Sequence, residues 1–343
     1  MINNFLNINL LNVISVIHII SVICVLFVIL FKDKISFYLR IMDYPDSNLK
    51  IHPTPTPRLG GLILYAYILP TTILNYIINP TGYKNFIIEF TLLIIFFIVG
   101  LVDDRKSLPA KNKIFVLLIT LFLTIPLSNE LIVTQINFKN LNFSISLLHG
   151  AIFFTIFSIF ALYNAFNFSD GENGVATSLG IFWIIFIMIK SGNYTSFYYQ
   201  AILISLTIIF YLNIQKKIFL GNSGSNLFSI MISLILIQEY KKKNIFCDEI
   251  FFILFLPGID MIRLTFQRLS NGKSPFLGDN NHLHHLMVNL IEKKFIFIAY
   301  ILISLVPILI YSFLISNFYI VFILSVMTYF MIIFLLTRLK KTI

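Results

Sequence analysis

Long apolar stretches alternate along the chain with short clusters that hold nearly all of the charged residues. A helix that crosses a bilayer needs about 20 apolar residues, with a range of roughly 17–25. The pattern predicts an all-α, polytopic transmembrane protein with about ten or eleven spans, since several stretches are short enough to be re-entrant or merely buried. The stretches cover residues 10–31, 59–79, 86–102, 113–127, 146–166, 175–190, 196–214, 225–238, 249–267, 294–315 and 317–337.

Within the stretch 249–267, Pro257, Gly258 and Asp260 predict a broken or bent span. The composition agrees with the pattern, because 58% hydrophobic and only 12% charged residues exclude an ordinary soluble domain. The first stretch is expected to be a retained span, since no Lys or Arg precedes it and no small-residue cleavage site follows. We expect residues 1–343 to form a single integral membrane domain.

The charges predict an orientation, because cytoplasmic loops of membrane proteins carry an excess of Lys and Arg. If residue 1 lies outside, the inner segments hold 19 of the 25 basic residues, and the lysines at 241–243 are the one cluster against this assignment. The same segments hold ten of the fifteen acidic residues and four of the six histidines. We therefore predict one polar site that faces the cytoplasm. The net charge of +10 then indicates a positive-inside membrane protein that also attracts anionic substrates, rather than a nucleic-acid binder.

The first two inner loops carry candidate chemistry. Lys50, His52 and Arg58 lie in a proline-rich loop that is either a rigid linker or a segment facing an anionic substrate. Asp103 and Asp104 end an apolar stretch, where adjacent carboxylates are costly to desolvate unless a cation or donor compensates them. A hard divalent cation such as Mg²⁺ would suit such oxygens. Shielding by the adjacent Arg105 and Lys106 is the simpler alternative.

The third and fourth inner loops are rich in small and polar residues. Asn164, Asn167 and Asp170 recur at i, i+3 and i+6, which predicts that they share one face of a helix end. The Gly-rich turn at 219–225, which contains Asn222, directly precedes a helix, and such a turn can present backbone N–H groups to a phosphate. An ordinary turn explains the same glycines.

The fifth inner loop places half of the six histidines within four residues, as His282, His284 and His285. Zinc is one interpretation, because His282 and His285 could share a helical face. Neither a cysteine nor an adequate third ligand lies nearby, so histidines that donate hydrogen bonds or charge to phosphates are the preferred hypothesis.

In this order, the five loops resemble the polyprenyl-phosphate N-acetylhexosamine-1-phosphate transferases, glycosyltransferase family 4-like enzymes of bacterial membranes that are related to phospho-N-acetylmuramoyl-pentapeptide transferase. The resemblance spans about residues 43–286. The motifs that carry it are Lys-x-His…Pro-Arg-x-Gly-Gly at 50–61, Gly-Leu-Val-Asp-Asp at 100–104, Asn-Ala-Phe-Asn-Phe-x-Asp-Gly-x-Asn-Gly at 164–174, Phe-Leu-Gly-x-Ser-Gly-Ser at 219–225 and Ser-Pro-Phe…Asn-His-Leu-His-His at 274–285.

The resemblance implies transfer of N-acetylhexosamine-1-phosphate from a UDP-sugar to undecaprenyl or another polyprenyl phosphate, with release of UMP. It implies a Mg²⁺ requirement, for which Mn²⁺ is a possible substitute, and a place in the bacterial cytoplasmic (inner) membrane with the active site facing the cytoplasm. The product would start a cell-envelope polysaccharide, in cell wall or lipopolysaccharide biosynthesis. By the same resemblance Asp103 and Asp104 are catalytic, and the metal and nucleotide loop includes Asn167, Asp170 and Asn222. The substrate-binding residues are then Lys50, His52, Arg58, Asn164, His282, His284 and His285.

Two departures from the family pattern stand out. Asn222 replaces the usual Asp of Phe-Leu-Gly-Asp, and Ser107 replaces the third acid of Asp-Asp-x-x-Asp. An amide oxygen can still coordinate Mg²⁺ but brings no charge, so we expect weaker metal binding unless another carboxylate, such as Asp170, compensates. A catalytically impaired family member and a secondary transporter are the alternatives, although the concentration of ionisable residues on one side disfavours a transporter.

Overall fold

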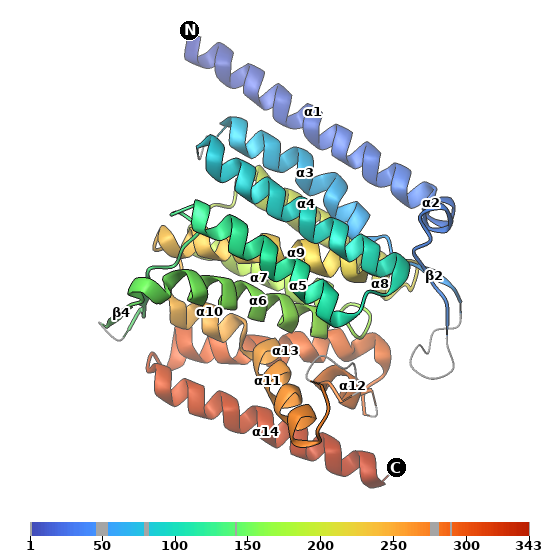
Figure 1. The fold of residues 1–343 in the computed structure, drawn as a ribbon, viewed down its shortest axis with the longest axis vertical. Coiled ribbons are helices and arrows are strands. Elements are labelled where there is room, and N and C mark those ends of the chain that lie inside the picture. The colour runs from blue at the N-terminus through green and yellow to red at the C-terminus, as the bar shows by residue number, and fades with distance from the viewer. Residues whose placement is uncertain are drawn as a thin grey trace. The chain divides into compact units, whose positions relative to one another are not determined.

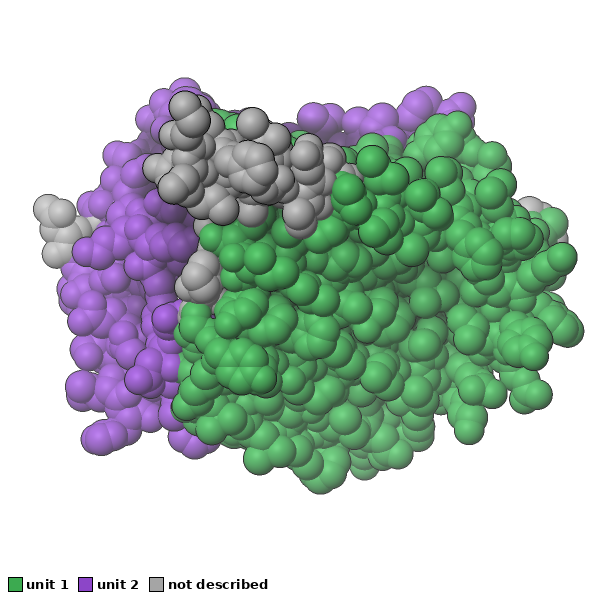
Figure 2. Space-filling view, turned by 90° about the horizontal axis from the view of Figure 1, so that it is seen from above, with its two compact units in different colours: residues 1–128, 184–231 green, residues 129–183, 232–343 purple. Residues whose placement is uncertain are grey.

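The computed structural model describes residues 2–45, 54–78, 82–140, 143–274, 281–288 and 290–342. The chain divides into two compact units, coloured separately in Figure 2. Unit 1 comprises Met1–Ser128 and Ile184–Met231, and unit 2 comprises Asn129–Trp183 and Ile232–Ile343. Whether they act as the single domain expected from the sequence stays a prediction.

Unit 1 is helical apart from one short strand pair (Figure 1). Its elements are α1 (Ile2–Leu30), α2 (Lys32–Leu39), β1 (Met42–Asp43), β2 (Thr56–Pro57), α3 (Gly60–Ile78), α4 (Tyr83–Lys106), α5 (Ala110–Thr124), the 3₁₀ turn η1 (Ile125–Leu127) and α8 (Phe197–Ile214). Helix α3 packs against both α1 and α8, and α4 packs against α5. The antiparallel strands pair Met42 with Pro57 and Asp43 with Thr56, which brings the chain before α3 beside the end of α2.

Unit 2 is also helical, with one short hairpin. Its elements are β3 (Gln135–Asn137), β4 (Ser144–Ser146), the 3₁₀ turn η2 (Leu148–Gly150), α6 (Ala151–Ser169), α10 (Cys247–Ile253), α11 (Phe255–Ser270), α12 (Leu283–Met287), the 3₁₀ turn η3 (Lys293–Phe295), α13 (Ile296–Leu309), the π-helical turn η4 (Ile310–Leu314) and α14 (Phe318–Thr342). Helix α6 packs against α11, and α12 contacts α13 and α14. The boundary between the units falls within α7 (Val175–Ser191) and α9 (Gly221–Lys241).

Seven helical segments in the described part of the chain are long and apolar enough to cross a membrane, which confirms an all-α, polytopic membrane protein. They are Gly60–Ile78, Tyr83–Lys106, Ala110–Leu127, Leu148–Ser169, Phe197–Ile214, Lys293–Leu314 and Phe318–Leu339. The pair Val16–Leu30 and Lys32–Leu39, bent by 78°, adds an eighth if it forms one span. All eleven stretches predicted from the sequence contain helix. The expected ten or eleven spans stay a prediction.

The stretch 249–267 is broken as predicted, but the break falls at Leu254, between α10 and α11. Pro257 therefore lies in the first turn of α11, where N–H groups have no intrahelical partner. Its missing N–H leaves the carbonyl of Ile253 without the usual donor four residues later. The fully buried Trp183 replaces that donor, since its indole Nε1–H donates to this carbonyl at 3.1 Å. The two helices are not among the seven candidate spans.

Candidate active site

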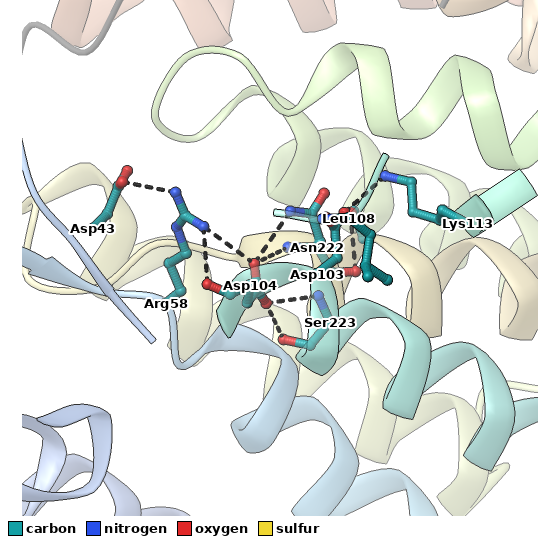
Figure 3. A network of polar contacts seen from close by, with 9 residues as sticks. Asp43, Arg58, Asp103, Asp104, Leu108, Lys113, Asn222 and Ser223 are labelled. Atoms are coloured by element: carbon teal, nitrogen blue, oxygen red, sulfur yellow. Dashed lines mark hydrogen bonds and ion pairs between the residues drawn. The ribbon is translucent and has the colours of Figure 1, made fainter. Parts of the chain in front are cut away.

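Asp103 and Asp104 lie in the last turn of α4, in unit 1, and both are buried. Two adjacent carboxylates in such a place need compensating donors or cations. Protein groups compensate both, and the two side chains point to different partners, as Figure 3 shows. The adjacent Arg105 and Lys106, which the sequence offered as a shield, make no ion pair with the acid pair among the contacts of the described residues.

The Asp104 carboxylate accepts hydrogen bonds from the start of α9. Its Oδ1 accepts from the backbone N–H of Asn222 at 2.8 Å and from the Asn222 amide at 3.3 Å. Its Oδ2 accepts from the backbone N–H and the hydroxyl of Ser223, at 2.9 and 2.7 Å. Two N–H groups of the Gly-rich turn are therefore engaged by Asp104, and the expected contact of this turn with a phosphate stays a prediction.

The Asp103 carboxylate is less fully engaged. Its Oδ1 accepts from the backbone N–H of Leu108 at 2.7 Å, and its Oδ2 forms an ion pair with Lys113 of α5 at 2.9 Å. A carboxylate offers about four acceptor sites, so two remain on Asp103 beside the contacts seen in the described residues. The side chain of Asp103 is 8% exposed, whereas that of Asp104 is fully covered. Asp103 is therefore the carboxylate of the pair that retains capacity for a ligand or a proton.

Close backbone contacts bring three of the five sequence motifs together in unit 1. A Cβ atom at Gly100 of α4 would lie 2.5 Å from the carbonyl oxygen of Asn222, so no larger residue fits there without a shift. Gly221 has a φ of +75°, which side-chain-bearing residues rarely adopt. The N–H of Gly60 and that of Gly61 donate to the carbonyls of Phe219 and Leu220, at 3.0 and 3.1 Å. The start of α3, the end of α4 and the start of α9 thus form one packed junction.

Arg58 lies at this junction, between two carboxylates. Its guanidinium forms an ion pair with Asp43 at 2.7 Å and donates to the backbone carbonyl of Asp104 at 3.3 Å. The pairing of β1 with β2 explains this position, because it places the residue after Pro57 beside Asp43. The structure therefore shows Arg58 holding protein groups, and its expected contact with an anionic substrate stays a prediction. Lys50 and His52, from the same loop, lie outside the described residues.

The remaining motif residues lie in unit 2. Asn164 and Asn167 occupy the last turns of α6, and the Asn164 amide donates to the carbonyl of Phe160 at 2.8 Å. Asp170 is the C-cap, with a φ of −85° and a ψ of 46°, so it has left the helix. The predicted shared helix face therefore holds for Asn164 and Asn167 but ends before Asp170, where the Asp-Gly turn stops α6.

A buried carboxylate that the sequence did not single out as a site residue organises the histidine motif. Asp260 of α11 is 3% exposed, and its Oδ2 accepts from His282 Nδ1 at 3.1 Å and from the backbone N–H of Leu283 at 3.2 Å. Its Oδ1 accepts from Arg263 at 2.8 Å and from the Tyr329 hydroxyl at 2.7 Å. Burial alone would raise the pKa of Asp260, but the His282 hydrogen bond and the Arg263 charge hold it well below the usual range.

The partners of His282 decide which ring nitrogen carries the proton. Arg268 lies 3.5 Å from Nε2 of His282, and a guanidinium can only donate. Nε2 is therefore the acceptor, and Nδ1 carries the proton that it donates to Asp260. Phe168 lies beneath both groups, with its ring centre 5.2 Å from the Arg268 guanidinium and 5.3 Å from the His282 ring.

The two other histidines of the motif have different surroundings. His285 lies 3.3 Å from the Glu172 carboxylate, which joins the third motif to the fifth. His284 is 1% exposed, and both of its ring nitrogens lack a hydrogen-bond partner in the described part of the chain. Burial, followed by the neighbouring His285 and His282, holds the pKa of His284 well below its usual value. A neutral His284 would therefore be available to donate one hydrogen bond to an anion.

Sequence reasoning missed Asp260, Arg263, Arg268 and Lys113 as members of these networks. The spacing of Asp260 and Arg263 at i, i+3 on a helix was an available signal. No local pattern links Lys113 to Asp103, because that ion pair depends on how α5 packs against α4.

The candidate ligands differ in how well they suit the expected Mg²⁺. Among the described residues, no group of three or more His, Cys, Asp or Glu side chains is placed to hold a metal ion. Asp104 does not fit, because α9 occupies both of its oxygens. Asp103 fits, since each of its oxygens accepts one hydrogen bond from the residues that the structure describes. The amide oxygen of Asn222 also fits, because it points away from Asp104 (Figure 3).

Comparison with known proteins gives one family and a consistent group of relatives. Residues 86–239 match the model of glycosyl transferase family 4. A probable undecaprenyl-phosphate N-acetylglucosaminyl 1-phosphate transferase of Bacillus subtilis (strain 168) is 25% identical over 262 residues, covering 74% of this chain and 72% of the relative. An undecaprenyl-phosphate alpha-N-acetylglucosaminyl 1-phosphate transferase of Escherichia coli (strain K12) is 24% identical over 272 residues, with 76% and 72% covered. A decaprenyl-phosphate N-acetylglucosaminephosphotransferase of Mycobacterium leprae (strain TN) is 24% identical over 302 residues, with 78% and 75% covered.

Proposed function

We propose that the chain is a member of glycosyl transferase family 4, whose model matches residues 86–239, and that it transfers N-acetylhexosamine-1-phosphate from a UDP-sugar to a polyprenyl phosphate and releases UMP. The observation that carries this proposal is the match over residues 86–239, which includes Asp103, Asp104, Asp170 and Asn222. The named relatives transfer N-acetylglucosamine 1-phosphate to undecaprenyl or decaprenyl phosphate, which supports the general reaction. The nucleotide of the donor and the particular sugar are parts of the proposal.

The proposed reaction needs charge stabilisation more than a strong base. A phosphomonoester has a second pKa near 6, so the lipid phosphate is mostly dianionic at neutral pH. One of its oxygens attacks the β-phosphorus of the donor, a new phosphorus–oxygen bond forms, and the bond to the bridging oxygen of UMP breaks. Asp103 is the residue that would take the proton from the minor monoanionic form, because its oxygens retain acceptor capacity beside Leu108 and Lys113.

We extend the proposal to a divalent metal, Mg²⁺ or Mn²⁺, held by Asp103 and the Asn222 amide oxygen. Such a cation would neutralise charge on the diphosphate, which approaches a second anion during the reaction. Asp170 and Asn167 are proposed as further ligands because they match the metal loop of the family. Arg268 would add positive charge near the diphosphate, and the neutral His284 would donate a hydrogen bond to it.

The cellular setting follows the same logic. A multi-pass membrane protein with its acidic and histidine motifs in the inner segments would act at the cytoplasmic face of the inner membrane, where it meets a soluble nucleotide-sugar. The lipid-linked product would then start a cell-envelope polysaccharide.

One assay tests the proposal. Purified protein in detergent is mixed with undecaprenyl phosphate and a panel of UDP-N-acetylhexosamines, and UMP is measured with and without Mg²⁺. We expect Mg²⁺-dependent UMP with at least one donor, and a loss of about a hundredfold or more in Asp103→Asn. Asp33→Asn is the matched control, because the Asp33 side chain is 69% exposed. If no donor yields Mg²⁺-dependent UMP, or if both variants behave alike, the proposed function is wrong.

A further inference from the structure

We propose that Asp104 is a positioning residue, which caps α9 from helix α4 and orients the Asn222 amide, and that residue 222 must therefore stay uncharged in this chain. The resemblance assigns Asp104 a catalytic role, and it treats Asn222 as a weakened metal ligand. The geometry of the junction instead gives Asp103 and Asp104 different roles. The part of this proposal that concerns catalysis rests on the proposed function, whereas the part that concerns the capping of α9 does not.

The carboxylate of Asp104 has no free hydrogen-bond acceptor site among the described residues. Its two oxygens accept four hydrogen bonds from Asn222 and Ser223, at 2.7–3.3 Å, and Arg58 lies 3.8 Å from Oδ1. A carboxylate has about four acceptor sites, so no site remains for a substrate proton or a metal. The side chain is fully covered. Asp104 therefore acts on the reaction through the groups that it holds.

The start of α9 explains why a distant carboxylate is needed. The first N–H groups of a helix have no intrahelical acceptor and are usually satisfied by a Ser, Thr, Asp or Asn directly before the helix. Here Phe219 and Leu220 precede Gly221, and none of them has a side-chain oxygen. Asp104, 118 residues earlier than Asn222, supplies the acceptor instead. The end of α4, which carries Asp103, is thereby fixed to the start of α9.

The Asn222 side chain depends on the same carboxylate. Its Nδ2 donates to Asp104 Oδ1, so its amide oxygen is turned away from Asp104, as Figure 3 shows. An Asp at position 222 would instead bring a second carboxylate oxygen to about 3.3 Å from Asp104 Oδ1, the distance that Nδ2 has now, and like charges so close disfavour each other unless a cation lies between them. The neutral residue is thus matched to its charged neighbour. If Asn222 were only a weakened ligand, an Asp there would improve metal binding without harming the fold.

A charge-exchange experiment separates these two views. The proteins are the natural chain, Asn222→Asp, Asp104→Asn and the double variant with both changes. Asn193→Asp, an exposed position in unit 1, is the matched control. Two quantities are measured for each protein: the unfolding temperature in detergent with EDTA and no substrate, and kcat and KM for UMP release.

We expect Asn222→Asp to lower the unfolding temperature by about 5 °C or more, and Asn193→Asp to leave it unchanged. The double variant should recover at least half of the loss in Asn222→Asp, because one carboxylate again faces one amide. Its kcat should exceed that of Asn222→Asp by about tenfold, with a smaller change in KM, since misplacement of reacting groups acts mainly on kcat. If Asp104 had a purely structural role, the double variant would recover its unfolding temperature, and kcat per folded protein would be the same in the natural chain and the three variants.

The proposal is overturned if Asn222→Asp unfolds at the natural temperature, or if the double variant loses the sum of the two single effects. An increased Mg²⁺ affinity in a fully stable Asn222→Asp protein would also overturn it, because residue 222 could then carry a charge beside Asp104. If the temperatures behave as expected but no protein releases UMP, the helix cap stands and the proposed function fails.

Discussion

Replacing Asp260 by Asn tests the network around the histidine motif. The two residues have nearly the same shape, but an amide has one oxygen and one NH₂ group, whereas Asp260 accepts hydrogen bonds at both oxygens. Arg263 and Tyr329 donate to Oδ1, and His282 and the Leu283 N–H donate to Oδ2. In either orientation of the amide, its NH₂ group therefore faces two donors and their hydrogen bonds are lost.

The expected loss of unfolding free energy in Asp260→Asn follows from the burial of Asp260 and Arg263. Asp260 is 3% exposed, and the Arg263 side chain is 13% exposed, so the change leaves a mostly buried guanidinium without its counter-charge. Removing one partner of a buried ion pair costs about 3–5 kcal/mol of unfolding free energy. Asp33→Asn, at a surface ion pair with Lys32, should cost below about 1 kcal/mol.

Reversible unfolding in mixed micelles measures both values. The single tryptophan, Trp183, lies in unit 2 with Asp260, so its fluorescence reports on the affected unit. Substituting Arg263→Met in the Asp260→Asn background should reduce the penalty, because the uncompensated charge is then gone. Equal costs at positions 260 and 33, or additive effects of the 260 and 263 changes, would refute the reasoning.

Three further outcomes are expected. Trp183→Phe should lower the unfolding free energy by about 1–3 kcal/mol, because it leaves the buried carbonyl of Ile253 without its hydrogen-bond donor. Circular dichroism measures this loss, and a smaller loss than in Trp183→Tyr would contradict the explanation. Unfolding free energy should fall as the pH drops below about 6.5, since His284 binds a proton more readily when unfolded, and His284→Phe should flatten that slope. Gly100→Ala should cost about 1–3 kcal/mol by crowding the Asn222 carbonyl, and an unchanged unfolding temperature would show that the junction is loose.

Apolar periodicity was sufficient to predict the helices, since each stretch long enough to need a bilayer contains helix in the structure. It placed the break in 249–267 a few residues late. Proline and glycine indicate that a helix is interrupted, but the position of the interruption depends on which carbonyls find other donors. In this chain the donor is Trp183, which lies 70 residues from Ile253.

The partners of the acid pair could not be predicted from the neighbouring residues in the sequence. The sequence indicates that Asp103 and Asp104 need compensation, and a cation or adjacent basic residues were equally reasonable sources. The actual donors are the start of α9 for Asp104 and Lys113 for Asp103, and both depend on tertiary packing. Likewise, the histidine motif was recognised from its spacing, whereas its anchor Asp260 was noted only as an acid within an apolar stretch.

The capping of α9 by Asp104 also bears on synthesis. Asn222 follows Asp104 by 118 residues, and at about 5–20 residues per second α9 is made roughly 6–24 s after the carboxylate that caps it. During that interval Asp104 lacks these donors, whereas the partners of Asp103, Leu108 and Lys113, follow it within ten residues. We therefore expect Asp104 to stay hydrated until α9 is made.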